Sequence, residues 1–436
     1  MQLRRFLWPK SLAGKLCAVG FAFLLILVVA YAAAAHFTSK RLAAAMKLSE
    51  EFGLSHDLDE LLGPSVAPEK NAAIALNEAG TLAKQFFNQS RQKHKLDANA
   101  DVLEHPALLA EYETLLNDAE YNRLLAQGDQ REAYRSTEIF VRPMIMANAN
   151  SALSDLRRSL ARAEHDVVLH LLRADRREEA ARRTLRVLRT IRKWEDKEPF
   201  LNASLVNIAV RGVAFSDLNA ILRGGGPLSP TLHAEIDEEL GRQESIMRVI
   251  PWMIQTGSLL GLDFYEQAPF SRIPFGSVIA NEGRTNALRY AYRVQRTADM
   301  PYIDAFNEIQ TMISEWKQAE GNPFGAMMTF GAASSLGAEP MGRKAFERTV
   351  ARARCLRALN AMASRGDFNA GLSSLGVPKA SLVDPFDMKT LRVKKTPNGP
   401  IIYSVGDDLT DDDGKVLPPE ISDHGFAPVQ TNAEKK

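Results

Sequence analysis

The chain has 436 residues, of which 45% are hydrophobic and 25% charged, with a formal net charge of +1. This length allows two or three domains or one extended helical array, and the near-zero charge argues against a nucleic-acid-binding protein. The two cysteines, Cys17 and Cys355, are too few for a disulfide framework or a cysteine-based metal knuckle.

An uncharged apolar segment at residues 16–36 decides the expected location. Its length is that of a helix spanning the roughly 30 Å hydrocarbon core of a membrane. Residues 1–15 carry four basic residues, so we expect them to remain in the cytoplasm as a basic tail. The sequence therefore predicts a single-pass protein of the inner (cytoplasmic) membrane. It would contact the lipid bilayer through residues 16–36 and have a periplasmic or otherwise extracytoplasmic body.

A cleaved signal peptide is the alternative for the same segment. Residues 32–35 are all alanine and offer an A-x-A cleavage site. The apolar run is longer than the about 7–15 residues of a signal-peptide core, which favours an uncleaved signal-anchor. Both interpretations place the body outside the cytosol.

The body begins with helical periodicity in residues 37–147. We expect helices over 41–62, ended by Gly63 and Pro64, and over 69–92 and 106–126. Residues 148–248 have the clearest amphipathic pattern. Here we expect one helix before a break at 174–176, a second after it, a third ending at 223–227 and a fourth over 230–248.

Short breaks between amphipathic helices predict antiparallel neighbours. The stretch HLLRADRREEAARRTLRVL, residues 170–188, resembles the turn and second helix of a tetratricopeptide-like hairpin. The expected fold is therefore mainly α. A transmembrane helix would precede an irregular helical bundle or α-solenoid.

The last two regions are less uniform. Residues 249–365 are expected to hold helices over 286–298, 304–320 and 343–365. A Gly-, Met- and Ala-rich loop over 321–342 would cover the core or bind a partner, and we favour the first. In residues 366–436 the pattern changes to strands at 391–395 and 400–405 around a Pro-Asn-Gly turn. A helix must cover one face of this hairpin, so we expect a small α+β module with an acidic turn and a flexible tail.

The series DPFDMKTLRVKKTPNGPIIYSVGDDLTDDDG, residues 384–414, carries a family resemblance. It resembles the C-terminal tail of a group of uncharacterised membrane-anchored proteins from planctomycete-type bacteria, in which DPFxGKPLxY and a turn precede YSxGxDxxDDGG. That tail is in turn similar to the end of type II secretion pseudopilins. This chain departs from the group at Met388, Thr390, Val393 and Lys415, which weakens an inherited ion site. The resemblance supports the expected location and architecture.

Clustered carboxylates in this tail suggest a cation site. Hard cations such as calcium require several oxygen ligands, and some pseudopilins bind calcium in a comparable loop. We therefore name as a candidate calcium site Asp407, Asp408, Asp411, Asp413 and Glu420. The alternative is a solvated acidic turn that holds no ion.

Two other patterns are weaker. His165 and His170 are five residues apart, about 500° around a helix, so they do not share a face for a metal. A basic stripe steps along one helix through Arg182, Arg186, Arg189 and Lys193, and it either meets an anionic partner or is a solvated face.

No GxSxG, P-loop, GxGxxG after a strand, or HExxH occurs. We therefore expect a non-catalytic, membrane-anchored scaffold or protein-interaction protein of the cell envelope, with a protein partner and no nucleic acid. The alternatives are an accessory component of a secretion or pilus-like machine and an unrecognised envelope enzyme.

Overall fold

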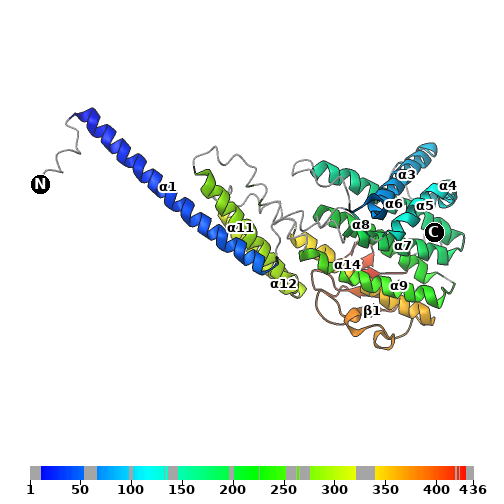
Figure 1. Cartoon of the computed structure of the whole chain (residues 1–436). Coiled ribbons are helices and arrows are strands. Elements are labelled where there is room, and N and C mark those ends of the chain that lie inside the picture. The colour runs from blue at the N-terminus through cyan, green and yellow to red at the C-terminus, as the bar shows by residue number, and fades with distance from the viewer. Residues whose placement is uncertain are drawn as a thin grey trace. The chain divides into compact units, whose positions relative to one another are not determined.

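The computed structural model of the chain describes residues 11–53, 66–97, 102–131, 133–135, 146–195, 201–224, 226–251, 262, 265, 275–320, 339–417, 420–421 and 423–428. Within these residues the fold is mainly helical with small antiparallel sheets near the C-terminus, which confirms the expected fold class. The chain divides into two compact units (Figure 1). One comprises Met1–Asp57, Gly257–Val294 and Met312–Leu336, and the rest of the chain forms the other.

The first unit is built on a long helix, α1 (Leu12–Glu51), beside α11 (Gly276–Thr297) and the end of α12 (Tyr302–Glu320) (Figure 1). The buried residues on the second half of α1 are Thr38, Leu42, Ala45 and Ser49. Their spacing of four, three and four residues is that of a coiled-coil seam. This half of α1 is therefore packed against protein.

Helices α1 and α11 run parallel. The rings of Tyr31 and Phe275 are 5.4 Å apart near one end, and those of Phe52 and Tyr292 are 4.5 Å apart near the other. The numbering of both helices rises in the same direction between these two contacts. The contacts also fix the register of the pair.

The first half of α1 has a different environment. Two described helical segments are long and apolar enough to span a membrane, Lys15–Glu51 and Ala203–Arg223. More than half of the apolar window is buried within the fold in the second segment, and none of it in the first. The second is therefore a core helix of the second unit, and α1 is the stronger candidate for a membrane span.

Three boundaries in this part of the chain differ from expectation. The first part of the helix expected over 41–62 is the end of α1, which stops at Glu51 where Gly53 adopts a φ of +71°. Residues 54–64, with the expected stop at Gly63 and Pro64, lie outside the described residues. Helix α11 starts at Gly276, not at 286, since packing overrides the weak helix propensity of Asn281 and Gly283. Of the loop expected over 321–342, residues 321–338 lie outside the described residues, and Glu339 already begins a helix.

The second unit is an array of helices. Their bounds are α3 (Ala72–Lys93), α4 (Pro106–Leu116), α5 (Ala119–Gln130), α6 (Met146–Arg173), α7 (Arg177–Glu195), α8 (Leu201–Arg223), α9 (Pro230–Gln243) and α14 (Glu339–Arg365). Short 3-10 helices lie at Pro68–Lys70, Val102–Glu104, Glu244–Arg248, Leu372–Ser374 and Lys379–Leu382.

These helices form two layers. In one, α6 packs between α3 and α8, and α8 packs against α14. In the other, α5 packs against α3, α7 against α6 and α8, and α9 against α7 and α14. Helix α14, from a later part of the chain, contacts both α8 and α9, so the array combines consecutive and distant helices. The irregular bundle and the α-solenoid both stay as descriptions of this mainly α array.

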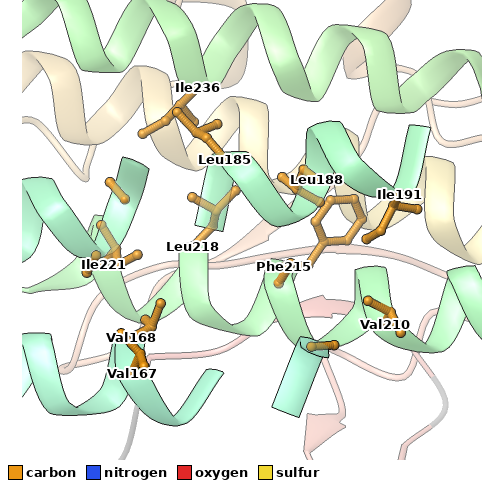
Figure 2. Packing of buried hydrophobic residues seen from close by; sticks show 14 of the residues in the cluster. Val167, Val168, Leu185, Leu188, Ile191, Val210, Phe215, Leu218, Ile221 and Ile236 are labelled. Atoms are coloured by element: carbon orange, nitrogen blue, oxygen red, sulfur yellow. The ribbon is translucent and has the colours of Figure 1, made fainter. Parts of the chain in front are cut away.

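The core of the array lies between the two layers (Figure 2). Leu185, Leu188 and Ile191 of α7 meet Phe215 and Leu218 of α8, and each of the five is at most 1% exposed. Burying one such side chain contributes about 1.5–3 kcal/mol. The apolar periodicity of these helices is thus explained by packing.

Two helix predictions in the array need correction. The helix expected over 106–126 is two helices, because the Asp118 carboxylate caps α5 by accepting a hydrogen bond from the Tyr121 N–H at 2.7 Å. The helix expected over 230–248 ends at Gln243, and its last turn tightens into the 3-10 helix Glu244–Arg248.

The C-terminal module contains the expected hairpin. Strand β1 (Arg392–Lys394) pairs antiparallel with β2 (Ile401–Ser404), and α14 covers the sheet through contacts with β2 and β5. A third strand, β5 (His424–Phe426), was not expected and pairs with β2. A second small sheet joins β3 (Val416–Leu417) to β4 (Glu420–Ile421).

Asp384 ties this module together. Its carboxylate is buried and accepts hydrogen bonds from the Phe386 N–H at 3.0 Å, the Ser404 hydroxyl at 2.8 Å and the Val405 N–H at 2.9 Å. It also pairs with Arg392 at 2.7 Å. The Asp-Pro-Phe and Tyr-Ser-Val segments of the tail motif therefore have a structural role in this chain.

Candidate functional site

The first residue of the predicted calcium site lies in a charge cluster. Asp407 pairs with Lys344, with Arg348 at 2.6 Å and with His424 at 3.3 Å. Burial raises the pKa of Asp407, but hydrogen bonds from Lys344 and Arg348 outweigh this effect and hold the pKa well below its ordinary value. The cationic partners of this carboxylate are therefore side chains of α14.

The other acidic residues of the turn contact neighbours of their own. Asp411 accepts a hydrogen bond from the Tyr403 hydroxyl at 2.9 Å, and Asp413 pairs with Lys394 at 2.7 Å. Asp408 caps its own turn by accepting from the Thr410 N–H at 3.0 Å. These carboxylates point to different partners.

A carboxylate that the sequence did not single out organises the turn. Asp423 is fully buried and accepts hydrogen bonds from the backbone N–H groups of Gly414 at 2.8 Å and Lys415 at 3.1 Å. The side chain of Glu420 lies outside what the structure describes. Among the described residues no three His, Cys, Asp or Glu side chains group in a way that could hold a metal ion. Calcium binding by the named residues stays a prediction.

The predicted basic stripe on α7 is paired along its length. Its contacts are Arg182 with Glu178 at 3.0 Å, Arg186 with Asp129 at 2.8 Å, Arg189 with Glu235 at 3.0 Å, and Lys193 with the carbonyls of Gly128, Asp129 and Arg131. Acidic side chains and carbonyls of the protein thus already offset these cations. The stripe therefore stabilises the packing of α7 on α5 and α9, and this explains it more directly than binding of an external anionic partner.

The two histidines are structural partners of different carboxylates. His170 contacts Glu113 at 2.6 Å, and His165 Nδ1 contacts Asp217 Oδ1 at 2.6 Å. Burial raises the pKa of Asp217, while the hydrogen bond with His165 opposes that rise. The second contact joins α6 to α8 at the surface of the array.

The neighbouring surface of α8 is lined by small side chains. Its exposed and partly exposed positions include Ala209, Gly212, Val213, Ser216 and Ala220, which recur with helical spacing. Such side chains leave the surface of α8 low between its neighbours in the layer, α6 and α14. An approaching chain could come close to the helix backbone here.

Arg352 of α14 extends over this low surface. Its Nη2 donates to the Ser216 hydroxyl at 3.4 Å, and its Nη1 would lie 3.3 Å from a Cβ added to Gly212. The guanidinium also lies 4.7 Å from the centre of the Phe426 ring. Burial lowers the pKa of Arg352, and no carboxylate among the described residues pairs with it.

Arg162 occupies the opposite border of the same surface, on α6. It is exposed, and its guanidinium lies 5.9 Å from the centre of the Phe87 ring of α3. It forms no ion pair with a carboxylate in the described part of the chain, but its charge opposes the rise in the pKa of the buried Asp166, four residues along α6. The array face is defined here as the surface formed by Arg162 and His165 of α6, Ala209, Gly212 and Ser216 of α8, and Arg352 of α14.

This surface was not expected from the sequence. The available signal was the recurrence of Ala209, Gly212, Ser216 and Ala220 along a predicted helix, which indicates an exposed face without bulky side chains. The arginines gave no signal, because the chain has 54 Lys and Arg residues and their pairing depends on the fold.

A histidine oriented by a buried carboxylate can serve as a general base when a nucleophile lies beside it. The Ser216 hydroxyl instead donates to the carbonyl of Gly212 at 3.0 Å. The arrangement therefore offers a cationic, hydrogen-bonding surface more directly than a catalytic set. Comparison of the chain with protein-family models, curated proteins and solved structures gave no match.

Proposed function

We propose that this protein is a single-pass, membrane-anchored scaffold of the cell envelope that holds a protein partner on the array face. The anchor would lie in the inner membrane of the cell. The amino-terminal end would then lie in the cytoplasm and the helical array outside the cytosol. The observation that carries the proposal is the contrast between the exposed apolar half of α1 and the well-packed array.

The exposure of α1 supports the anchor. Leu24 is 57% and Val28 is 56% exposed, and none of the surrounding apolar window is buried by protein. Exposed apolar surface costs about 25 cal/mol per Å² in water, and a bilayer removes this cost. The packed seam on the other half of α1 is in keeping with an aqueous juxtamembrane segment.

The construction of the array supports the scaffold. Helical arrays present extended surfaces, and proteins commonly use such surfaces to bind other proteins. The array face adds two arginines that lack a carboxylate partner among the described residues. A role in a secretion or pilus-like machine and an envelope enzyme stay alternative predictions.

Cell fractionation tests the anchor. The Leu24→Arg/Val28→Arg variant places two charges in the apolar segment and should move most of the protein out of the membrane fraction. Ala43→Arg/Ala44→Arg is the matched control, since both positions are exposed on the half of α1 that packs on α11. The control should remain membrane-bound.

Protease protection tests the orientation. Trypsin added to spheroplasts should digest the array, and in inverted membrane vesicles the array should be protected. The reverse pattern, or full-length protein in the soluble fraction, would reject the proposed location.

A further inference from the structure

We propose that the array face binds an acidic, extended segment of a partner protein, whose carboxylates contact Arg162 and Arg352. This inference rests on the proposed scaffold function and specifies the chemistry of its partner.

The charge of the face supports an anionic occupant. Arg162 and Arg352 form no ion pair among the described residues, although Arg162 acts on the buried Asp166, whereas Lys344 and Arg348 both pair with Asp407. Arg352 is partly buried against Phe426 and α8. A carboxylate that reaches it forms a charge-assisted hydrogen bond at a reduced cost of dehydration.

The spacing of the two arginines fits an extended chain. Neighbouring helices in a layer are about 8–10 Å apart, so the axes of α6 and α14, which flank α8, are about 16–20 Å apart. The guanidinium of Arg162 lies near Phe87 of α3, so this distance is a lower bound on the spacing of the two arginines. An extended segment at about 3.3 Å per residue therefore needs at least about five or six residues to reach both. Arg352 already covers Gly212 and Ser216, so the backbone of such a segment would approach α8 beside the exposed Ala209.

The geometry of Arg352 favours a peptide carboxylate over an anionic membrane surface. One face of the guanidinium lies over the Phe426 ring, so its N–H edge is the part available to a planar carboxylate. The group lies low over Gly212 and Ser216 of the neighbouring helix. A single chain can lie on this surface, while a flat layer of headgroups would require protruding cations.

Fluorescence anisotropy of a labelled peptide tests the inference. The protein is the full chain in a neutral detergent, and the probe is a ten-residue peptide of alternating aspartate and serine. The control probe has asparagine in place of every aspartate. We expect the acidic probe alone to bind, with an affinity that falls as the salt concentration rises.

Variants assign the binding to the array face. Arg162→Ala/Arg352→Ala should weaken the binding of the acidic probe at least tenfold. Arg182→Ala removes an exposed arginine that is paired with Glu178 on α7, so this control should bind as the wild type does. Gly212→Leu keeps every charge but places a side chain against the Arg352 guanidinium, and moving that group should weaken binding by a similar factor. Thermal unfolding followed by circular dichroism shows whether each variant is folded. If the double variant is unfolded, the single variant Arg162→Ala, at an exposed site, tests whether the acidic probe binds the array face.

Three results would overturn the inference. The first is equal binding of the acidic and the control probe. The second is unchanged affinity in both Arg162→Ala/Arg352→Ala and Gly212→Leu. The third is displacement of the acidic probe by short-chain phosphatidylglycerol but not by short-chain phosphatidylcholine. The last would assign the face to anionic lipid. Since these variants leave the apolar half of α1 intact, fractionation of the same proteins reports separately on the anchor.

Discussion

Arg211 and Glu195 form an ion pair in the interior of the helical array, with Nη2 and Oε2 2.5 Å apart and side chains only 1% and 5% exposed. Arg211 Nε also donates to Gln243 Oε1 at 2.5 Å, so the network joins α8 to the end of α7 and to α9. Removing one member of such a pair leaves the other charge buried without its partner. The network of Arg211, Glu195 and Gln243 thus fixes how these three helices of the array meet.

Arg211→Met should therefore lower the free energy of unfolding by about 3–5 kcal/mol. Arg211→Met/Glu195→Met removes both charges and should recover a large part of that loss. Arg242→Ala is the control, because its pair with Glu238 is exposed and exposed pairs contribute about 0–1 kcal/mol. Thermal unfolding of the three variants gives the comparison. A double variant less stable than Arg211→Met would contradict the prediction.

The cluster around Asp407 predicts a pH dependence. The pKa of Asp407 is lower in the folded state than in the unfolded state, so ionisation of this carboxylate stabilises the fold. The stabilisation is complete above the ordinary aspartate pKa of about 3.9 and is lost as the pH falls below it.

Asp407→Asn tests this dependence. It should cost about 1–3 kcal/mol at pH 7, because Lys344 and Arg348 lose their carboxylate. The difference in melting temperature between wild type and variant should narrow at pH 3. A difference of constant size across this range would show that the ion pairs do not stabilise the fold.

The helices of the array could largely be predicted from the sequence because they are amphipathic. The break at 174–176 is correct, and Asp175 there adopts a φ of +60°. Strand β5 could not be predicted, since its three residues show no alternation and pair with a distant strand. Gly425 occupies its centre, where an added Cβ would lie 2.2 Å from the Ile402 carbonyl. The need for glycine there becomes visible only when the two strands are adjacent.

The array face could not be predicted from the sequence for a related reason. An arginine is informative when it lacks a counter-ion, and that property depends on residues far away in the chain. Arg352 and Ser216 are 136 positions apart. The tail motif shows the converse, since its acidic residues look like a ligand set in sequence, yet Asp407 and Asp413 pair with cations.

The parallel register of α1 and α11 can be tested by disulfide formation. Asn281 Nδ2 lies 3.4 Å from Thr38 Oγ1, so Thr38→Cys/Asn281→Cys should oxidise readily in a Cys17→Ser background. Thr38→Cys/Leu288→Cys shifts the partner by seven residues, about 10 Å along the helix, and should not cross-link. A gel-mobility shift under oxidising conditions reports the bond. Cross-linking of the second pair in preference to the first would show that the register is wrong.

Asp384 should be the most sensitive position in the C-terminal module. Asp384→Ala removes the acceptor of the buried Val405 N–H and Ser404 hydroxyl and one carboxylate partner of Arg392, so we expect a loss of about 3–5 kcal/mol. Asp408→Ala is the control, because that carboxylate only caps an exposed turn. Limited trypsin digestion should cleave the first variant rapidly after Arg392 or Lys394 and leave the second as resistant as the wild type. Equal resistance of both variants would mean that the hairpin holds its place on α14 without this carboxylate.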